Sequence, residues 1–512
     1  MVEATLQKGI ISELPQKSFG LKIDWVITED LRLDSTYYSN ERFLAKRLLQ
    51  ESKYSLNKVG DLCTELFNLN RFRRVWVEKE HGYPYMGPSE IFLFELPRER
   101  FVSKETTKKI EKFFVKEGWI LLTCSGIVGR PLLVSKSFTD YFLSHDLIRV
   151  IPKEDVYSGY LYAFLSTWIA QALITKDRYG MTVQHIEPEH VKEVPIPELS
   201  DEIERNIHVN IVKSCSIREK ARKLQNQAEA LLTKELGLEK SASNNEKIFS
   251  VKSSELDLRF DASYHTPYAQ NLIELMKKSG NELFKIGDPA ISQIFIPPRF
   301  KRLYVGKEYG IPLLQGSDIA ESKICEMKYI SKKTKHLNKW QVKEGWVLVT
   351  CSGTLGRTAL VTKVWDNYAV SQHALRIIPN ASKLHPGYLK AFLASKWGYG
   401  QILAKTYGGV VDELSENDMK EIYIPLPSSY DIQEGIGNLT IQASELKQKA
   451  NLVEDATIKT FEEMLSKYRC DSPNAKEELD AYNETFALIG NEELNVSEGL
   501  DQEQKGGTKF LG

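Results

Sequence analysis

Two stretches of the chain repeat apolar residues with the spacing of a long amphipathic helix. The apolar positions recur every three or four residues, as they do where one stripe of a helix is buried against a partner helix. The first stripe consists of Ile203, Ile207, Ile211, Cys215, Ala221, Leu224, Ala228 and Leu231. The second consists of Ile432, Ile436, Leu439, Ala443, Leu446, Ala450, Val453, Phe461 and Leu465. These patterns predict two long helices, over residues 200–240 and 428–470.

The first of these helices also carries end signals. Ser200, followed by Glu202 and Glu204, is typical of a capped and acidic first turn, and Gly237 predicts the end of the helix. At about 1.5 Å per residue, such a helix is roughly 50 Å long. Two such helices, each following a globular segment, favour an antiparallel pair that buries the two stripes against each other and holds the globular segments apart.

Shorter patterns precede each long helix. Residues 91–96, 119–123 and 131–134 are apolar runs of strand length. Residues 158–174 have the three-four spacing of an amphipathic helix. Strands and helices are therefore mixed, which predicts an α+β fold class.

One block of this mixed region occurs twice. Residues 115–134 (VKEGWILLTCSGIVGRPLLV) return as residues 342–361 (VKEGWVLVTCSGTLGRTALV), with 14 of 20 positions identical and an offset of 227 (342 minus 115). That offset is too large for a solenoid repeat and has the size of a domain. Further matches pair Asp30–Asp34 with Asp257–Asp261, Lys58–Asp61 with Lys285–Asp288, Gly159–Leu161 with Gly387–Leu389, and Ile196-Pro197 with Ile424-Pro425.

The repeat and the helices together predict the domain organisation. We expect two similar mixed α/β domains, separated by two long antiparallel coiled-coil-like helices and related by a pseudo-two-fold internal repeat. The predicted boundaries are an N-terminal extension at 1–20, a first domain at 21–199, a central helix at 200–240, a linker at 241–248, a second domain at 249–427, a C-terminal helix at 428–470 and an acidic, flexible tail at 471–512.

Composition restricts the function classes. The formal net charge is −1, so any nucleic-acid surface must be a local patch. The 6 cysteines form no C-x-x-C pair, which argues against a zinc site and suits a reducing compartment. No stretch resembles a signal peptide or a transmembrane span. We therefore expect a cytoplasmic protein with no metal, no cofactor and no membrane partner.

Basic residues gather at matching places in the two copies. Arg71, Arg73 and Arg74 surround one phenylalanine, and Arg299, Lys301 and Arg302 surround another. Such side chains bind DNA phosphates or the O6/N7 edge of guanine. The alternative is ordinary surface charge at a strand end. The matched pairs Arg130 and Arg357, at a Ser-Gly-x-x-Gly-Arg turn, and Arg149 and Arg376, which begin the matching stretches 149–152 and 376–379, complete the DNA-binding candidates.

Those turns allow a structural interpretation as well. Their glycines permit close backbone approach, which could cradle a phosphate, but a shared hairpin with an internally paired arginine would have the same sequence. Catalysis by the adjacent Cys124-Ser125 and Cys351-Ser352 is disfavoured, because no matched histidine accompanies them in both copies. No phosphate-binding loop, dinucleotide fingerprint or methyltransferase motif is present.

The order of module, long helix, module and long helix resembles the specificity subunit of Type I restriction–modification enzymes, over nearly the whole chain. The two repeated blocks and the two Ile-Pro pairs before the helices carry the resemblance. It implies two target-recognition domains that read a bipartite, asymmetric double-stranded DNA site. It also implies a non-catalytic helical rod that docks two adenine-N6 methyltransferase subunits and restriction/translocase subunits. Ile203, Ile207, Ile211, Leu224, Leu231, Ile436, Leu439, Leu446, Val453 and Phe461 would form that rod.

Two other function classes remain open. In one, the chain is a protein–protein scaffold with paired modules and no DNA reading, which its near-neutral charge favours. In the other, it is a self-contained enzyme, which the missing cofactor motifs disfavour. The recognised DNA sequence, the spacer length and the presence of restriction activity do not follow from the residues.

Overall fold

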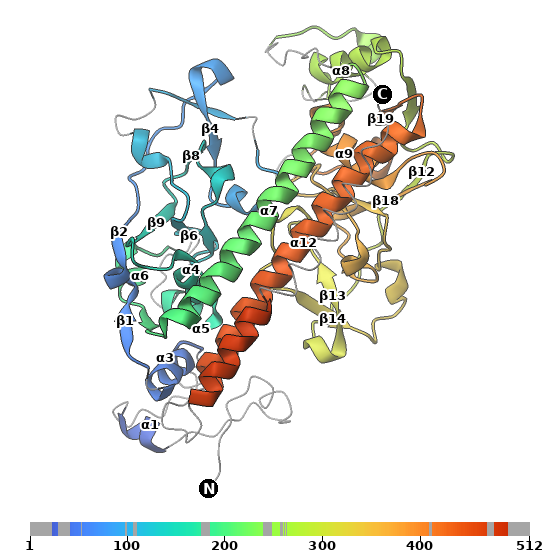
Figure 1. Ribbon diagram of the computed structural model, residues 1–512. Coiled ribbons are helices and arrows are strands. Elements are labelled where there is room, and N and C mark those ends of the chain that lie inside the picture. Colours follow the sequence, from blue (N-terminus) through green and yellow to red (C-terminus); the bar gives the residue numbers. More distant parts are fainter. Residues whose placement is uncertain are drawn as a thin grey trace, which may run out of the picture. The chain divides into compact units, whose positions relative to one another are not determined.

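The computed structural model (Figure 1) describes residues 23–28, 41–52, 54–97, 100–105, 110–175, 185–238, 248–256, 260, 262, 264–408, 412–467 and 476–489. The chain divides into two compact units. The first unit comprises residues 1–88, 99–213 and 453–512, and the second comprises residues 89–98 and 214–452. The predicted Asp30–Asp34 and Asp257–Asp261 repeat falls, apart from Phe260, outside the described residues.

The first unit contains short strands in three sheets. Its four-stranded sheet has the order β2 (Cys63–Phe67), β9 (Leu147–Pro152), β6 (Ile120–Thr123) and β7 (Pro131–Leu133). A second sheet has the order β3 (Trp76–Val77), β5 (Phe101–Ser103), β4 (Gly82–Met86) and β8 (Phe142–Leu143), with β4 and β8 parallel. β1 (Leu56–Lys58) pairs with β10 (Pro195–Pro197). Besides the long helices and the tail helix described below, the described residues of this unit form α1 (Ile23–Thr28), α3 (Glu41–Ser52), α4 (Ser158–Ser166), α5 (Trp168–Ile174) and α6 (Pro188–Lys192).

The second unit repeats this topology. Its four-stranded sheet has the order β12 (Ser292–Phe295), β18 (Ala374–Pro379), β15 (Val347–Thr350) and β16 (Thr358–Leu360). Its second sheet has the order β14 (Lys328–Ser331), β13 (Gly310–Leu314) and β17 (Ala369–Val370), and β11 (Glu282–Lys285) pairs with β19 (Tyr423–Leu426). Its short helices are α8 (Pro267–Lys278), α9 (Pro386–Ala394), α10 (Lys396–Ala404) and α11 (Glu416–Lys420). The predicted α+β class with a repeated module is confirmed.

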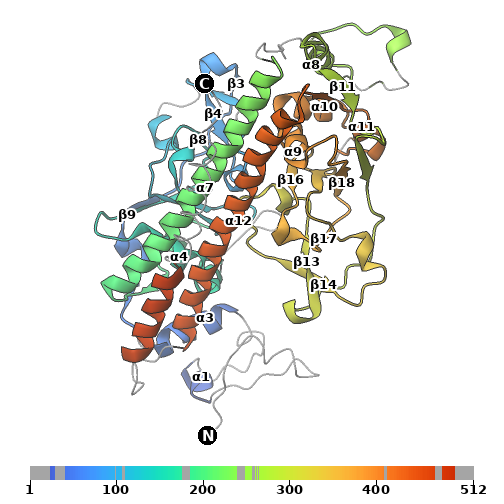
Figure 2. The same ribbon diagram turned by 45° about the vertical axis from the view of Figure 1, so that its right-hand side comes forward.

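The two long helices are α7 (Asp201–Glu235) and α12 (Tyr430–Lys467). α7 ends before Gly237, whose φ of 63° lies in the left-handed region that glycine adopts without strain. Within the second unit the helices lie side by side (Figure 2), with Ala221 of α7 against Ala443 of α12. Arg218 Nη2 donates to Asn451 Oδ1 at 2.9 Å. From the first contact to the second, the residue number falls on α7 and rises on α12. The two helices are therefore antiparallel.

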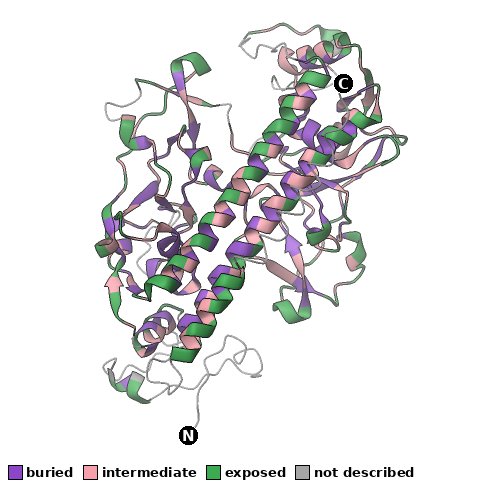
Figure 3. Cartoon of the chain, in the orientation of Figure 1, coloured by how far each residue is buried: buried purple, intermediate pink, exposed green. Residues whose placement is uncertain are grey.

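Buried and exposed residues alternate along both long helices (Figure 3). Six of the ten rod residues are buried, namely Ile203, Ile207, Ile211, Ile436, Val453 and Phe461. The other four are partly buried and pack against core clusters of the second unit, namely Leu224, Leu231, Leu439 and Leu446. Their apolar area is therefore largely used in packing within the chain, which stabilises the helices.

The repeated Gly-Tyr and Ile-Pro pairs have a shared packing role. A side chain at Gly159 would come within 2.8 Å of His208 on α7, and one at Gly387 within 2.3 Å of the Gly437 carbonyl on α12. Glycine therefore lets α4 and α9 approach the long helices closely. The next residue of each motif is a buried tyrosine, and the hydroxyls of Tyr160 and Tyr388 donate to the carbonyls of the Ile-Pro prolines.

Two local predictions were wrong. Residues 91–96 form no strand; Glu90–Phe92 is a 3₁₀ turn, and the chain then makes one bridge, between Leu93 and Glu321, within the second unit. The apolar run reflects burial of Ile91, Phe92 and Phe94, since a buried turn and a buried strand can have the same composition. Residues 158–174 form two helices, because Thr167 is extended (φ −68°, ψ 151°) and caps α5 by accepting from the Ala170 amide.

The tail contains a helix over residues 476–489, which differs from the flexible tail predicted there. Phe486 is completely buried. Two asparagines of α7 hold this helix: Asn206 Nδ2 donates to Asn483 Oδ1 at 2.6 Å, and Asn210 Nδ2 donates to the Phe486 carbonyl at 2.8 Å. That carbonyl lies in the last turn, where helical carbonyls have no partner within the helix. The tail helix is thus a packed part of the first unit.

Replacing Phe486 with alanine should release the tail helix, because a phenylalanine truncated in a core costs about 3–5 kcal/mol and a helix of this length is marginal alone. Limited trypsin digestion should then cut at the exposed Lys476 faster than in the wild type. Leu488→Ala is the matched control, because Leu488 is 58% exposed on the same helix. Equal cutting of the Phe486 variant and the wild type would show that the tail does not depend on this contact.

Candidate nucleic-acid interface

The basic segment of the first copy is anchored by its phenylalanine. Phe72 is half-buried and packs edge-on against Phe113, Phe142 and His145, with ring centroids 4.8, 5.3 and 5.6 Å away. Its basic neighbours are exposed, namely Arg71, Arg73 and Arg74. The buried phenylalanine ring therefore anchors the backbone of this segment, while the guanidinium groups of its arginine neighbours stay at the surface.

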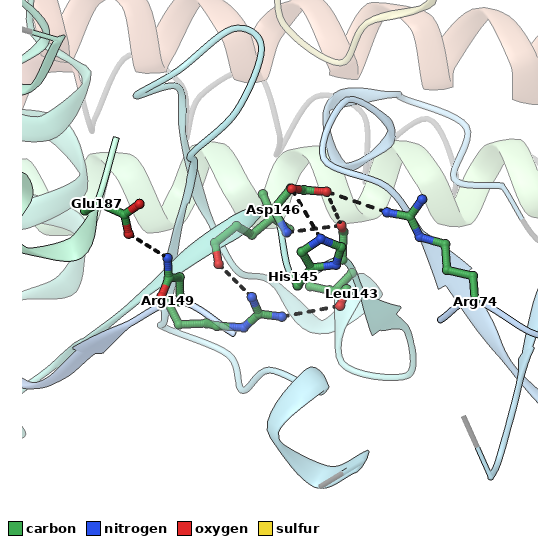
Figure 4. A network of polar contacts seen from close by, with 9 residues as sticks. Arg74, Leu143, His145, Asp146, Arg149 and Glu187 are labelled. Carbon is green, nitrogen blue, oxygen red and sulfur yellow. Dashed lines mark hydrogen bonds and ion pairs between the residues drawn. The ribbon is translucent and has the colours of Figure 1, made fainter. Parts of the chain in front are cut away.

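A polar loop lies beside this segment (Figure 4). The loop contains Ser144, His145 and Asp146, between strands β8 and β9. Arg74 Nη2 lies 3.6 Å from Asp146 Oδ2, and the Ser144 hydroxyl donates to the same carboxylate at 3.1 Å. The fold thus brings together two short segments that lie about 70 positions apart in the sequence, as 144 minus 74 shows.

His145 in this loop is held in its neutral form. Burial lowers its pKa below the ordinary value, and the positive charges of Arg74, Arg71 and Arg149 act in the same direction, against Asp146. Its Nδ1 atom is buried and has no hydrogen-bond partner among the described residues. Its Nε2 atom lies 3.5 Å from Asp146 Oδ1, so the ring packs against the carboxylate of the polar loop.

The second copy builds the same arrangement with different residues. Phe300 packs against Trp340, with ring centroids 4.4 Å apart. Arg302 Nη2 donates to Gln372 Oε1 at 3.0 Å, from the loop between β17 and β18. The next residue is His373, whose pKa is lowered by burial and by the charges of Arg302 and Arg299. An arginine on the basic segment and a polar partner on the loop are thus common to both copies, while the partner changes from carboxylate to amide.

Two of the predicted contacts are wrong. Arg149 and Arg376 are completely buried. Arg149 Nη1 donates to the Leu147 carbonyl at 2.6 Å, and Nη2 to the Leu143 carbonyl at 3.4 Å. Arg376 donates to the carbonyls of Val370, Ser371 and Ala374. Both guanidiniums are therefore structural: they satisfy the carbonyls of the polar loops and hold those loops in place, and they cannot reach DNA.

Exposed aromatic residues complete both surfaces, and the sequence analysis missed them. Trp76 and Tyr304 occupy equivalent positions two residues after Arg74 and Arg302, and they are 48% and 50% exposed. The guanidinium of Arg100 lies over the Trp76 ring, 5.5 Å from its centroid. The repeat offset of 228 (304 minus 76) was the signal that could have identified this pair.

Comparison with known proteins gives a decisive match at this point. The sequence profile of the Type I restriction modification DNA specificity domain matches residues 51–213 and again residues 278–440, together more than half of the chain.

The chain belongs to this family.

Solved structures of specificity subunits resemble the chain only loosely. The S subunit of a Type I restriction–modification system from M. genitalium is 15% identical, covers 81% of this chain and 95% of its own, and has a TM-score of 0.30. The HsdS subunit from Thermoanaerobacter tengcongensis is 14% identical, covers 79% and 96%, and has a TM-score of 0.25. Likenesses at these TM-scores carry no argument. The comparison with curated proteins gives no match.

The specificity-domain repeats also share the Ser-Gly-x-x-Gly-Arg turn. Gly126, Gly129, Gly353 and Gly356 all have φ between 73° and 83°. In each turn a strand threonine accepts from the arginine amide, at 3.0 Å for Arg130 and 2.9 Å for Arg357. Both arginines are half-buried, and Arg357 lies 5.4 Å from the Tyr399 ring centroid. The turn is thus a structural hairpin, and a phosphate contact by its arginines stays a prediction.

The two repeated cysteines of this specificity-domain chain are poor nucleophiles. Burial raises the pKa of Cys124 to about 12 and that of Cys351 to about 11, so both thiols stay protonated at neutral pH. Within the described residues, no group of three His, Cys, Asp or Glu side chains is placed to hold a metal ion. None of the described helices combines the length and apolar character needed to cross a bilayer.

Proposed function

We propose that this chain is the DNA-sequence-specificity subunit of a Type I restriction–modification complex, and that each module reads one half of a bipartite double-stranded site. The observation that carries the proposal is the repeated surface. In each copy an exposed basic segment, an exposed aromatic residue and a polar loop with a neutral histidine lie together. A protein of net charge −1 that concentrates cations at two equivalent places has the local patches that DNA binding needs.

Different residues of this surface would serve affinity and specificity. Arg71, Arg73, Arg299 and Lys301 are exposed and suited to phosphates; Arg130 and Arg357 remain proposed phosphate contacts. Affinity should therefore fall steeply with salt, because each neutralised phosphate releases counterions. Arg74 and Arg302 are oriented by a second side chain, which suits a base edge.

The two modules should read different half-sites. A carboxylate at Asp146 accepts hydrogen bonds only, as from the amino group of cytosine, whereas the amide of Gln372 both donates and accepts and suits adenine. The partner of the reading arginine thus changes chemistry between otherwise equivalent surfaces. This difference supports an asymmetric recognition sequence.

The rest of the assembly is proposed on the family assignment. The chain itself is non-catalytic, two adenine-N6 methyltransferase subunits dock on the rod formed by α7 and α12, and restriction/translocase subunits complete a cytoplasmic complex. The proposed domains remain residues 21–199 and 249–427, although the family profile begins later and extends into each long helix.

Methylome sequencing of the source strain, with and without this gene, tests the function. We expect a bipartite adenine motif that loses its methylation on deletion and regains it when the gene is returned. The purified chain should also shift duplexes that carry this motif in preference to random duplexes. An unchanged methylome together with no duplex binding at low salt would reject DNA reading and favour the protein–protein scaffold.

A further inference from the structure

A small pocket in the second unit holds an unusual set of charges. It lies between α9, α12, the strand β16 with the turn before it, and the segment 93–95 that follows the Glu90–Phe92 turn. Its polar lining consists of Glu95, Arg357, Thr358, Lys390, Ser444, Lys447 and Gln448. None of these belongs to the reading surface at residues 299–302 and 371–373, although Arg357 is also a proposed DNA phosphate contact.

Lys447 is a buried cation with one weak hydrogen-bond partner among the described residues. Its side chain is only 7% exposed. The ammonium lies 5.2 Å from the ring centroids of both Phe94 and Trp365, and it donates one hydrogen bond, to the Glu321 carbonyl at 3.4 Å. An ammonium has three donors, so most of its hydrogen-bonding capacity is unused.

The neighbouring groups do not supply the missing acceptor. Glu95, the pocket's carboxylate, is paired with the buried Lys390, whose ammonium also donates to Gln225 Oε1 at 2.8 Å. Two further polar atoms of the lining residues, Arg357 Nε and Thr358 Oγ1, are buried and have no hydrogen-bond partner in the part of the chain that the structure describes. The lining therefore carries three cations, one carboxylate and several unsatisfied donors.

Such an arrangement is costly unless a negative group balances it. Buried charges are normally paired, and an unpaired buried donor costs about 1–3 kcal/mol. Oxygen atoms of an anion could accept from an ammonium, a guanidinium and a hydroxyl at once, which is how phosphate groups are bound in proteins. Water supplies acceptors but no compensating charge.

We propose that this pocket binds a tetrahedral oxyanion, either inorganic phosphate or a phosphoryl group of a larger ligand, through Lys447, Arg357 and Thr358. The bound anion would join α12 to the strand β16 and to the segment 93–95. The site would therefore connect a helix of the proposed rod to a segment that comes from the first half of the sequence. This proposal does not depend on DNA reading by the two modules.

The ionisation of Lys447 offers a readout of occupancy. Burial, and then the charges of Lys390 and Arg218, lower its pKa to about 8 against the opposing carboxylates of Glu95 and Glu321. A lysine in the unfolded chain keeps a pKa near 10.5. Between about pH 8 and pH 10.5 the unfolded chain therefore binds more protons than the folded chain, and the free energy of unfolding rises with pH. A bound oxyanion keeps Lys447 protonated and should therefore remove the rise of the free energy of unfolding with pH.

The test is thermal unfolding of the full chain in sodium phosphate and in sodium chloride of equal ionic strength. Phosphate at about ten times its dissociation constant should raise the Tm of the wild type by about 3 °C. Thr358→Val, which keeps the side-chain shape, should lose most of this gain, and so should Lys447→Met. Lys459→Met is the matched control, because Lys459 lies on the same helix with a side chain 76% exposed.

Each outcome decides the proposal. Equal Tm in the two salts, or an equal phosphate gain in all variants, would overturn it. Because Lys447→Met alters a buried charge, Thr358→Val keeps the test valid if that variant fails to fold. Duplex binding at low phosphate distinguishes the sources: weaker binding by Thr358→Val identifies a DNA phosphodiester as the occupant, and unchanged binding identifies a free ion.

Discussion

Replacing Arg302 with alanine is expected to weaken binding to one half-site by about tenfold to one hundredfold, and to leave the other half-site unaffected. Arg302 is the base-reading candidate of the second copy, and Gln372 orients its guanidinium through a 3.0 Å hydrogen bond. A good bidentate contact contributes about 1–3 kcal/mol of discrimination, and about 1.4 kcal/mol corresponds to a factor of ten. Arg74→Ala should have the reciprocal effect on the first half-site.

The measurement is competition binding with duplexes in which each half-site is scrambled in turn. Lys285→Ala is the control for loss of one positive charge in the same unit. The Lys285 side chain is 44% exposed and paired with Glu421, and Lys285 lies on the β11–β19 sheet, which holds none of the proposed contacts. Equal loss on every duplex would make Arg302 a phosphate contact. No loss on any duplex would remove the residue from the interface.

The repeat made much of this architecture predictable. Two copies of one block, each followed by a helical stripe, were sufficient to predict the fold class, because three-four spacing and domain-sized repetition reflect packing in any environment. The apolar pattern gave a wrong prediction where the burial of a segment depends on residues that are distant in the sequence. Ile91, Phe92 and Phe94 are apolar because they pack within the second unit, and no ladder of strand hydrogen bonds forms there.

Site residues were harder to assign than elements. Arg71 and Arg149 are both arginines at repeated positions, yet one is exposed and the other is completely buried. The distinguishing signal is local: Arg149 lies between Ile148 and Val150, inside an apolar run that forms a central strand, whereas Arg71 is in a basic segment. The sequence shows no matched histidine at equivalent repeat positions, yet His145 and His373 lie in the same loop of their modules.

The second large effect concerns these buried arginines. Arg376→Ala should lower the free energy of unfolding of the second unit by about 3–5 kcal/mol, because it removes the hydrogen bonds of a buried guanidinium to three carbonyls and opens a cavity. Burial lowers the pKa of Arg376 to about 9, still above neutral pH, so the guanidinium donates in its charged form. Arg376→Lys should cost nearly as much, since one ammonium cannot reproduce the planar fork.

Urea denaturation followed by tryptophan fluorescence measures this loss, and Arg149→Ala provides the matched variant, because it should destabilise the first unit instead. Arg376→Met fills most of the arginine volume but has no hydrogen-bond donors, so it should lower the free energy of unfolding less than Arg376→Ala does. The difference between the two variants measures the contribution of the cavity, and the remaining loss measures the missing hydrogen bonds. Arg302→Ala should leave the transition unchanged. A stable Arg376→Ala chain that binds DNA poorly would place this guanidinium in the interface after all, and would mean that the polar loop is not held by its carbonyl contacts.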